Sequence, residues 1–161
     1  MNRSICVFLI LAIFTISLSA REINLNQTFN TIKNSDKHLL IWLHKTNCGY
    51  CDSMQINTLK NNQIKAYIDE KFLFVHINIS DNDKVIYKKF VGSGRDFAKH
   101  MGFDFYPTSL FFTQRSQLIY KAIGYHNEIL FGKILKFIDT QSYQNMDYDT
   151  FENNNDFKEE L

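Results

Sequence analysis

Two cysteines, Cys48 and Cys51, are separated by two residues, and this spacing predicts redox chemistry. The third cysteine, Cys6, lies in an N-terminal segment that has the features of an export signal. If that segment is removed, Cys48 and Cys51 are the only thiols that remain. A disulfide between them closes a very short loop, which restricts the unfolded chain little and therefore stabilises little. The pair thus favours a redox role over a structural one.

The predicted export signal occupies residues 1–20. Arg3 supplies its positive start, and residues 5–16 are apolar. Small residues follow, and we expect cleavage after Ser19 or Ala20. The apolar run is shorter than the roughly 20 residues that span a bilayer, so cleavage is preferred and an uncleaved membrane anchor remains the alternative.

Length and charge bound the rest of the chain. A mature form of about 141 residues is enough for one domain, which we expect over residues 21–140. Removal of Arg3 with the signal leaves 17 basic and 17 acidic residues, so neither nucleic acid nor, after cleavage, a membrane is an indicated partner. Acidic residues gather in a tail over residues 141–161, which we expect to be partly disordered and loose beyond about Thr150.

The segments around the cysteines predict a strand that ends just before a helix. Residues 39–43 form a continuous apolar run, as in a strand buried on both faces. After Cys51, apolar residues recur at helical spacing as far as residue 72, with a polar interruption that predicts two helical pieces or one bent helix. Cys48 would then lie at a helix N-terminus, where unpaired backbone N–H groups favour a thiolate. His44 and Lys45 are candidates to lower the pKa of Cys48 further.

The two cysteines are predicted to have different roles. The thiolate of Cys48 would attack a substrate disulfide and form a mixed disulfide. Cys51, one helical turn further and more buried, would resolve it. The reverse sequence oxidises a substrate dithiol, and the residues do not fix the direction.

The remaining predicted elements complete an α/β fold. They are a buried strand at 72–79, a short helix at 85–90, a loop at 92–94, a helix at 95–101 that Gly102 ends, a hairpin of strands at 109–113 and 118–122, and a helix at 129–138. This order implies a central mixed sheet with helices on both faces.

The chain resembles thioredoxin-fold proteins over about residues 22–140. Beyond the cysteine motif, residues 76–79 match the central strand of that fold, and residues 101–112 match its proline loop. The resemblance implies a cis peptide bond before Pro107.

The same resemblance assigns a substrate groove. It implies that Pro107 faces the cysteines and that Tyr106 and Thr108 line the groove beside them. Gly49 and Tyr50, between the cysteines, are further candidates for contact with substrate. No cofactor is expected apart from the redox-active disulfide.

Within the fold, the chain is most similar to small exported bacterial thioredoxins. The shared features are Cys-Gly-Tyr-Cys-x-x-Met, Gly124-Tyr125 and Ser142-Tyr143. This similarity implies a monomeric periplasmic thiol-disulfide oxidoreductase that reduces protein disulfides and has an unidentified redox partner. A dithiol oxidase or disulfide isomerase is the alternative activity. Residues 158–161 (Lys-Glu-Glu-Leu) are similar to the signal for retention in the endoplasmic reticulum, whose lumen is the alternative location.

Two departures from the family pattern leave alternatives open. Trp42 occupies the position of a buried acid that serves proton transfer in thioredoxin, so His44, Lys45 or a water is a candidate for that task. Residues 84–95 resemble an insertion that either borders the active site or packs on its flank. Together the departures motivate a second hypothesis, a non-catalytic module that binds client proteins.

A zinc site would require two histidine ligands in addition to the cysteines. The five histidines are scattered along the chain at His38, His44, His76, His100 and His126. Because no pair of them has ligand spacing, we expect no metal. His76 lies on a predicted buried strand, where a hydrogen-bonded core histidine is expected.

Overall fold

The computed structural model describes residues 20–154. The predicted signal peptide, apart from Ala20, lies outside the described residues, as do residues 158–161 of the tail. Among the helices of this described part, none is long and apolar enough to cross a bilayer.

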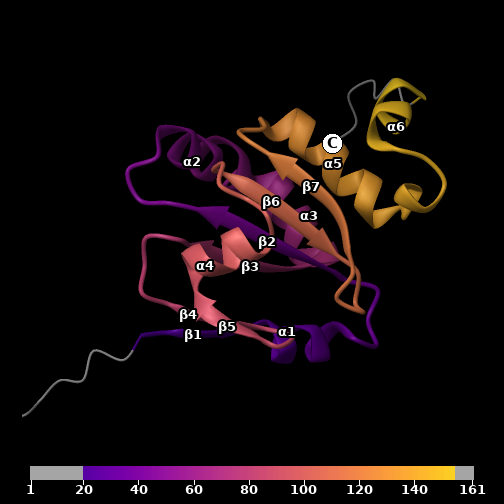
Figure 1. Cartoon of the computed structure of the whole chain (residues 1–161). Helices are drawn as coiled ribbons and strands as arrows, with labels where there is room; N and C mark the ends of the chain where they lie inside the picture. Colours follow the sequence, from indigo (N-terminus) through magenta and orange to yellow (C-terminus); the bar gives the residue numbers. More distant parts are fainter. Residues whose placement is uncertain (1–19, 155–161) are drawn as a thin grey trace, which may run out of the picture.

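Strands and helices alternate along most of the chain (Figure 1). In chain order they are β1 (Glu22–Asn24), α1 (Leu25–Ile32), β2 (His38–His44), α2 (Gly49–Ser53), the π-helix η1 (Met54–Leu59), α3 (Asn62–Lys71), β3 (Phe72–Asn78), β4 (Lys84–Tyr87), β5 (Phe90–Ser93), α4 (Gly94–His100), β6 (Thr108–Phe112), β7 (Leu118–Ile123), α5 (Glu128–Asp139), the 3-10 helix η2 (Ser142–Gln144) and α6 (Tyr148–Asn154). Asparagine side chains accept hydrogen bonds from the first backbone N–H groups of α1, α3 and α5, and these bonds fix where the helices begin.

Strand β2 lies inside a four-stranded sheet with the order β3-β2-β6-β7. It runs parallel to β3 and antiparallel to β6, and β6 pairs antiparallel with β7. All residues of β2 except His44 are buried, as expected for an apolar strand covered on both faces. The predicted α/β architecture, with a mixed sheet and helices on both faces, is confirmed.

Strand β3 differs from its prediction because it lies at an edge of this sheet. An edge strand has a neighbour on one side only, so its middle residues are half-buried at most. His76 is exposed, and the expectation of a buried core histidine is wrong. The apolar run of the sequence does not distinguish an edge strand from a central one.

Helices on the two faces of the sheet enclose two apolar clusters. Because the side chains of β2 alternate between the faces, Leu39, Ile41 and Leu43 belong to one cluster and Leu40 and Trp42 to the other. The first cluster includes residues of α1, β4 and α4, and the second includes residues of α2, α3 and α5. Figure 1 shows α5 and α1 on opposite sides of the sheet. Both cysteines belong to the second cluster.

Residues 84–93 form a hairpin, so the predicted helix at 85–90 is wrong. Val85 and Tyr87 are buried and their neighbours are less so, which is the period of a strand. Strand β4 pairs in parallel with β1 and antiparallel with β5, forming a separate three-stranded sheet. Gly92 lies inside β5 and not in the predicted loop. A Cβ atom at this position would come within 2.7 Å of the Phe90 ring. The predicted insertion thus packs beside β1 on the flank of the domain.

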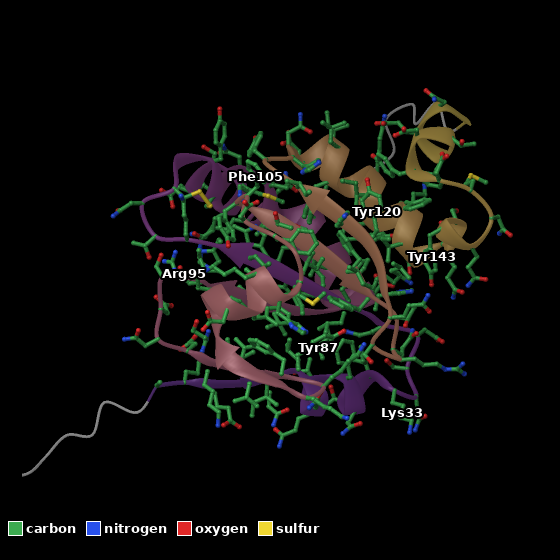
Figure 2. All side chains as sticks on the ribbon, viewed as in Figure 1. Lys33, Tyr87, Arg95, Phe105, Tyr120 and Tyr143 are labelled. Atoms are coloured by element: carbon green, nitrogen blue, oxygen red, sulfur yellow. A yellow bond between two sulfur atoms is a disulfide. The ribbon has the colours of Figure 1, made fainter. Side chains whose placement is uncertain are left out.

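The chain after α5 folds back onto the domain through aromatic side chains. The ring of Phe137 on α5 contacts the rings of Tyr148 and Phe151, with centroid distances of 5.5 and 5.1 Å. Figure 2 shows Tyr120 and Tyr143 beside α5. Phe151 is buried by these contacts.

The expectation that the tail is loose beyond Thr150 is therefore wrong as far as Asn154, where α6 ends. The acidic composition suggests a solvated segment, but Tyr148 and Phe151 bury enough apolar surface to dock the helix. Composition alone does not show that these aromatic residues pack against α5.

We predict that acid destabilises the fold through His38. Its Nε2 atom lies 3.2 Å from the Tyr143 hydroxyl, and burial lowers the pKa of His38 below its ordinary 6.5, although Asp139 opposes this shift. A histidine with a lowered folded-state pKa takes up a proton on unfolding, so stability is lost as pH falls below about 6.5. Urea unfolding of a His38→Gln variant should show a smaller loss of stability between pH 7 and 5 than the parent. A His100→Gln control, at an exposed position, should keep the parent profile, and equal profiles for both variants would contradict the prediction.

Candidate functional site

A loop between β2 and α2 positions the cysteine pair. The side chain of Asn78, at the end of β3, donates to Thr46 Oγ1 at 3.0 Å, and the backbone N–H of Thr46 donates to Ser80 Oγ at 3.2 Å. The backbone of Asn47 is left-handed, with φ 58°, a conformation that asparagine adopts more readily than most residues. These contacts fix the conformation of the loop. Cys48 follows it as the N-cap residue of α2.

Cys48 and Cys51 form a disulfide, with their Cα atoms 5.2 Å apart. The backbone N–H of Cys51 lies 3.2 Å from Cys48 Sγ and donates a hydrogen bond to it. A hydrogen bond of this kind favours the charged form of a reduced Cys48. Cys48 is 7% exposed and Cys51 2%, so the predicted order of burial is confirmed. Cys48 is therefore the more exposed residue of the pair and has a donor for its thiolate.

The loop that ends in Pro107 lies against the cysteines. The carbonyl oxygen of Tyr106 is 3.9 Å from Cys48 Sγ, and the Tyr106–Pro107 peptide bond is cis. The backbone N–H of Gly124 donates to the Pro107 carbonyl at 2.8 Å, which ties the end of β7 to this loop. Tyr106 is half-buried and packs against both apolar clusters. Burial raises the pKa of its phenol, so it remains neutral.

Thr108 does not present its side chain in a surface groove. It is fully buried, and its hydroxyl donates to the Phe105 carbonyl at 2.7 Å. Its role is to shape the proline loop from within, and the expectation of a groove-lining side chain is wrong. Thr108 pairs with Leu43 and Ser109 with Trp42, so their side chains project to opposite faces of the sheet. The proline motif in the sequence does not show which of the two faces the cysteines.

Large apolar side chains are exposed on segments that carry or adjoin the cysteine pair and the proline loop, and we call them the apolar rim. Its members are Tyr50, Ile56, Phe105, Ile123 and Tyr125. Tyr50 is 72% exposed and Phe105 69%, and Gly49 is also exposed. The segments that carry them are joined by the Gly124–Pro107 contact and by a hydrogen bond of 2.7 Å from the Thr58 hydroxyl to the His126 carbonyl. The apolar rim is therefore a candidate binding surface.

Of this rim, the sequence indicates Tyr50 as a substrate contact and Tyr125 only as part of the Gly124-Tyr125 motif. Phe105, beside the proline loop, is the member that a sequence signal could have found, because it directly precedes Tyr106 in the proline motif. Figure 2 shows Phe105 at the end of the molecule where α2 lies. Ile56 and Ile123 have no such signal, because their exposure depends on the packing of η1 and β7.

His44 and Lys45, the two candidates to lower the pKa of Cys48, differ in their burial and contacts. Lys45 is exposed, and the contacts of the described residues do not join it to Cys48. His44 is half-buried, and its ring stacks on Trp42 with a centroid distance of 4.2 Å and an interplanar angle of 15°. Burial lowers the pKa of His44 first, and the charge of His76 lowers it further, against the opposing effects of Asp81 and Asp52. An effect of His44 or Lys45 on the thiol of Cys48 stays a prediction.

No group of three or more His, Cys, Asp or Glu side chains within residues 20–154 is arranged to hold a metal ion. The two cysteines that a zinc site would need are bonded to each other.

No curated protein matches the chain significantly. A thioredoxin-fold protein from Helicobacter pylori is 24% identical, with 85% of each chain covered and a TM-score of 0.63. A thioredoxin from Thermus thermophilus is 14% identical over 75% of this chain and 88% of that one, with a TM-score of 0.57. The oxidised C-terminal domain of DsbD from Neisseria meningitidis is 17% identical over 72% and 91%, with a TM-score of 0.52.

At these identities the likeness to solved structures establishes the fold alone. The family itself is shown by sequence, because the thioredoxin-like domain matches residues 25–139, which is most of the described chain. With its mixed sheet, its Cys48–Cys51 disulfide and this match, the chain belongs to the thioredoxin-like domain family.

Proposed function

We propose that the protein is an exported thiol-disulfide oxidoreductase that reduces disulfides in other proteins. The observation that carries the proposal is the Cys48–Cys51 disulfide at the start of α2, with the Tyr106 carbonyl 3.9 Å from Cys48 Sγ. A disulfide between residues three positions apart closes a very short loop and therefore stabilises the fold little. Its place between a loop and the start of a helix favours exchange with substrate disulfides.

The reaction begins with the reduced pair. The thiolate of Cys48 attacks one sulfur of a substrate disulfide, the other substrate sulfur leaves as a thiolate, and a mixed disulfide forms. Cys51 then attacks Cys48 Sγ, which releases the second substrate thiolate and restores the Cys48–Cys51 disulfide. An external dithiol must reduce this disulfide before the next turnover, and this donor is the proposed redox partner.

The apolar rim is the proposed substrate surface. Tyr50 and Phe105 present exposed rings near Cys48, which suits a polypeptide segment with apolar residues beside its disulfide. The Tyr106 carbonyl, beside Cys48 Sγ, is available to orient the backbone of that segment. The partners are therefore proteins that carry disulfides or thiols, in line with the general property of the fold.

Direction is tested by the reduction potential of the pair. A reductase should equilibrate with dithiol buffers near −270 mV, as thioredoxin does, whereas strong oxidants lie near −120 mV. We expect the Cys48–Cys51 couple at the reducing end of this range. A value near the oxidising end would overturn the reductase proposal and favour a dithiol oxidase or isomerase.

Export to the periplasm is the proposed location, with the lumen of the endoplasmic reticulum as the alternative. It is supported by the leader pattern of residues 1–20 and by a cysteine pair suited to a disulfide-handling compartment. The N-terminal residue of the protein recovered from its own cells tests it: a start at Ala20 or Arg21 is expected, and an intact Met1 in the cytosol would contradict it.

A further inference from the structure

Three buried polar atoms on one face of the sheet have no hydrogen-bond partner among the described protein atoms. They are Trp42 Nε1, His44 Nε2 and Ser109 Oγ. Trp42 is 2% exposed and Ser109 1%. An unpartnered buried polar atom costs about 1–3 kcal/mol, so three of them near one another require an explanation.

The three side chains share a face of the sheet. Trp42 and His44 are two residues apart on β2, so they project to the same side, and their rings are stacked. Ser109 on β6 is the direct cross-strand partner of Trp42, so it projects to that side as well. A fourth unpartnered atom, His38 Nδ1, lies at the far end of β2 and is not part of this group.

This face is also the face of the cysteines. Trp42 belongs to the same packed cluster as Cys48 and Cys51. Asp52, the residue after Cys51, acts electrostatically on His44, which places the imidazole within range of the start of α2. Trp42, His44 and Ser109 therefore lie on the same face of the sheet as the redox pair.

The chemistry of the second step needs a proton acceptor there. Only a thiolate attacks a disulfide, so Cys51 must lose its proton when it resolves the mixed disulfide. Cys51 is only 2% exposed, so an acceptor on the buried side of the pair would assist the loss of this proton. Indole Nε1 is a donor only and a hydroxyl is a weak base, whereas a neutral imidazole accepts a proton readily.

We propose that Trp42, His44 and Ser109 hold an ordered water beneath Cys51 and that His44 accepts the Cys51 proton through this water during resolution. A polar site with several unpartnered groups is the kind of site that holds buried water. The water accepts from Trp42 Nε1, donates to His44 Nε2 and shares a hydrogen bond with Ser109 Oγ. Trp42 and Ser109 are positioning residues in this arrangement.

The step is balanced within the proposed function, on which this inference rests. The Cys51 proton passes to His44, and the Cys51 thiolate attacks Cys48 Sγ. The Cys48–Cys51 bond forms as the bond from Cys48 to the substrate sulfur breaks, and the electron pair leaves on the substrate thiolate. The imidazolium then releases its proton to solvent or to that thiolate.

The surroundings of His44 fit an acceptor at neutral pH. The charged and titratable groups that act on it are His76 from β3, Asp81 from the turn after β3 and Asp52 from α2. Burial and His76 together outweigh the two carboxylates, and the net pKa lies below 6.5. The neutral form therefore predominates at pH 7, and the rate of resolution should fall as pH drops below about 6.5.

Single-turnover kinetics with an unsymmetrical peptide disulfide separate the two steps. The first peptide leaves when Cys48 attacks, and the second leaves when Cys51 resolves the mixed disulfide. In a His44→Gln variant, we expect the second release to slow by about a hundredfold at pH 7, the contribution typical of a general base. Its dependence on pH below 6.5 should also disappear, while the first release changes by less than about twofold.

Two further variants sharpen the test. Ser109→Ala removes one anchor of the water and should slow the second release severalfold, with the pH dependence retained. His100→Gln is the matched control, because this exposed histidine on α4 is not among the groups that act on His44, and its second release should equal that of the parent.

An unchanged second release in His44→Gln would overturn the relay and leave the proposed oxidoreductase intact, as would an equal slowing of both releases. Failure of the parent protein to give any first release would overturn the oxidoreductase proposal, and the relay with it.

Discussion

Replacing Cys48 by serine is expected to lower the rate of protein-disulfide reduction by about a thousandfold or more, because the loss of a nucleophile leaves only the uncatalysed background. Cys48 is the more exposed residue of the pair, and its sulfur accepts the hydrogen bond from the Cys51 N–H. The other thiol of the pair, Cys51, is more deeply buried and is the less able of the two to meet a substrate disulfide. The measurement is the rate of reduction of a protein disulfide with a dithiol as electron donor.

A Gln55→Ala variant is the control for this substitution, since Gln55 is exposed on the helical segment that follows α2. It should keep the parent rate within about twofold, as surface changes of this kind usually have small effects. A Cys48→Ser variant that retained its biological activity in cells would contradict the catalytic account. That result would instead favour the second hypothesis, a module that binds client proteins through the apolar rim.

The second large effect concerns stability: Phe151→Ala should lower the free energy of unfolding by about 3 kcal/mol. Phe151 is buried, and its ring packs against Phe137 on α5. Its removal would leave a cavity between α5 and α6 that the short helix α6 can only partly close. Chemical denaturation, with the midpoint and slope fitted together, measures the loss.

Phe105→Ala is the matched control for this prediction, because the same substitution is made at an exposed ring. Its free energy of unfolding should change by less than about 0.5 kcal/mol. Equal stabilities for Phe151→Ala and the parent would mean that the C-terminal helix does not dock as described.

The central part of the fold could be predicted because local pattern and burial agree there. Residues 39–43 are apolar on both faces, and the strand they predict is found with the cysteine pair immediately after it. The helix at 129–138, the hairpin at 109–122 and the end of α4 before Gly102 also match, since the spacing of apolar residues and the turn residues indicate one structure in each case.

The predictions that are wrong concern segments whose structure depends on contacts with distant parts of the chain. Residues 84–93 are too short and mixed for their period to be clear, and pairing with β1 makes them strands. His76 was placed in the core because the sequence does not tell an edge strand from a central one. The docking of Phe151 depends on the surface that α5 presents, which the acidic tail sequence does not reveal.

The candidate site shows the same division. Cys48 and Cys51 lie in one recognisable motif and Pro107 lies in another. The structure brings these two segments together. Ser109 could not be recognised, because its place beside Trp42 follows from the register between β2 and β6. Only the three-dimensional structure shows that register.

The most direct test of the account is to identify the bond that a Cys51→Ser variant makes with a disulfide substrate. Without the resolving thiol, the mixed disulfide cannot be released and should accumulate. The reduced variant, mixed with a peptide disulfide and quenched with acid, is analysed by mass spectrometry after digestion. The account predicts a stoichiometric adduct of one peptide on Cys48, which a dithiol removes. A variant that forms no adduct at Cys48 would contradict it.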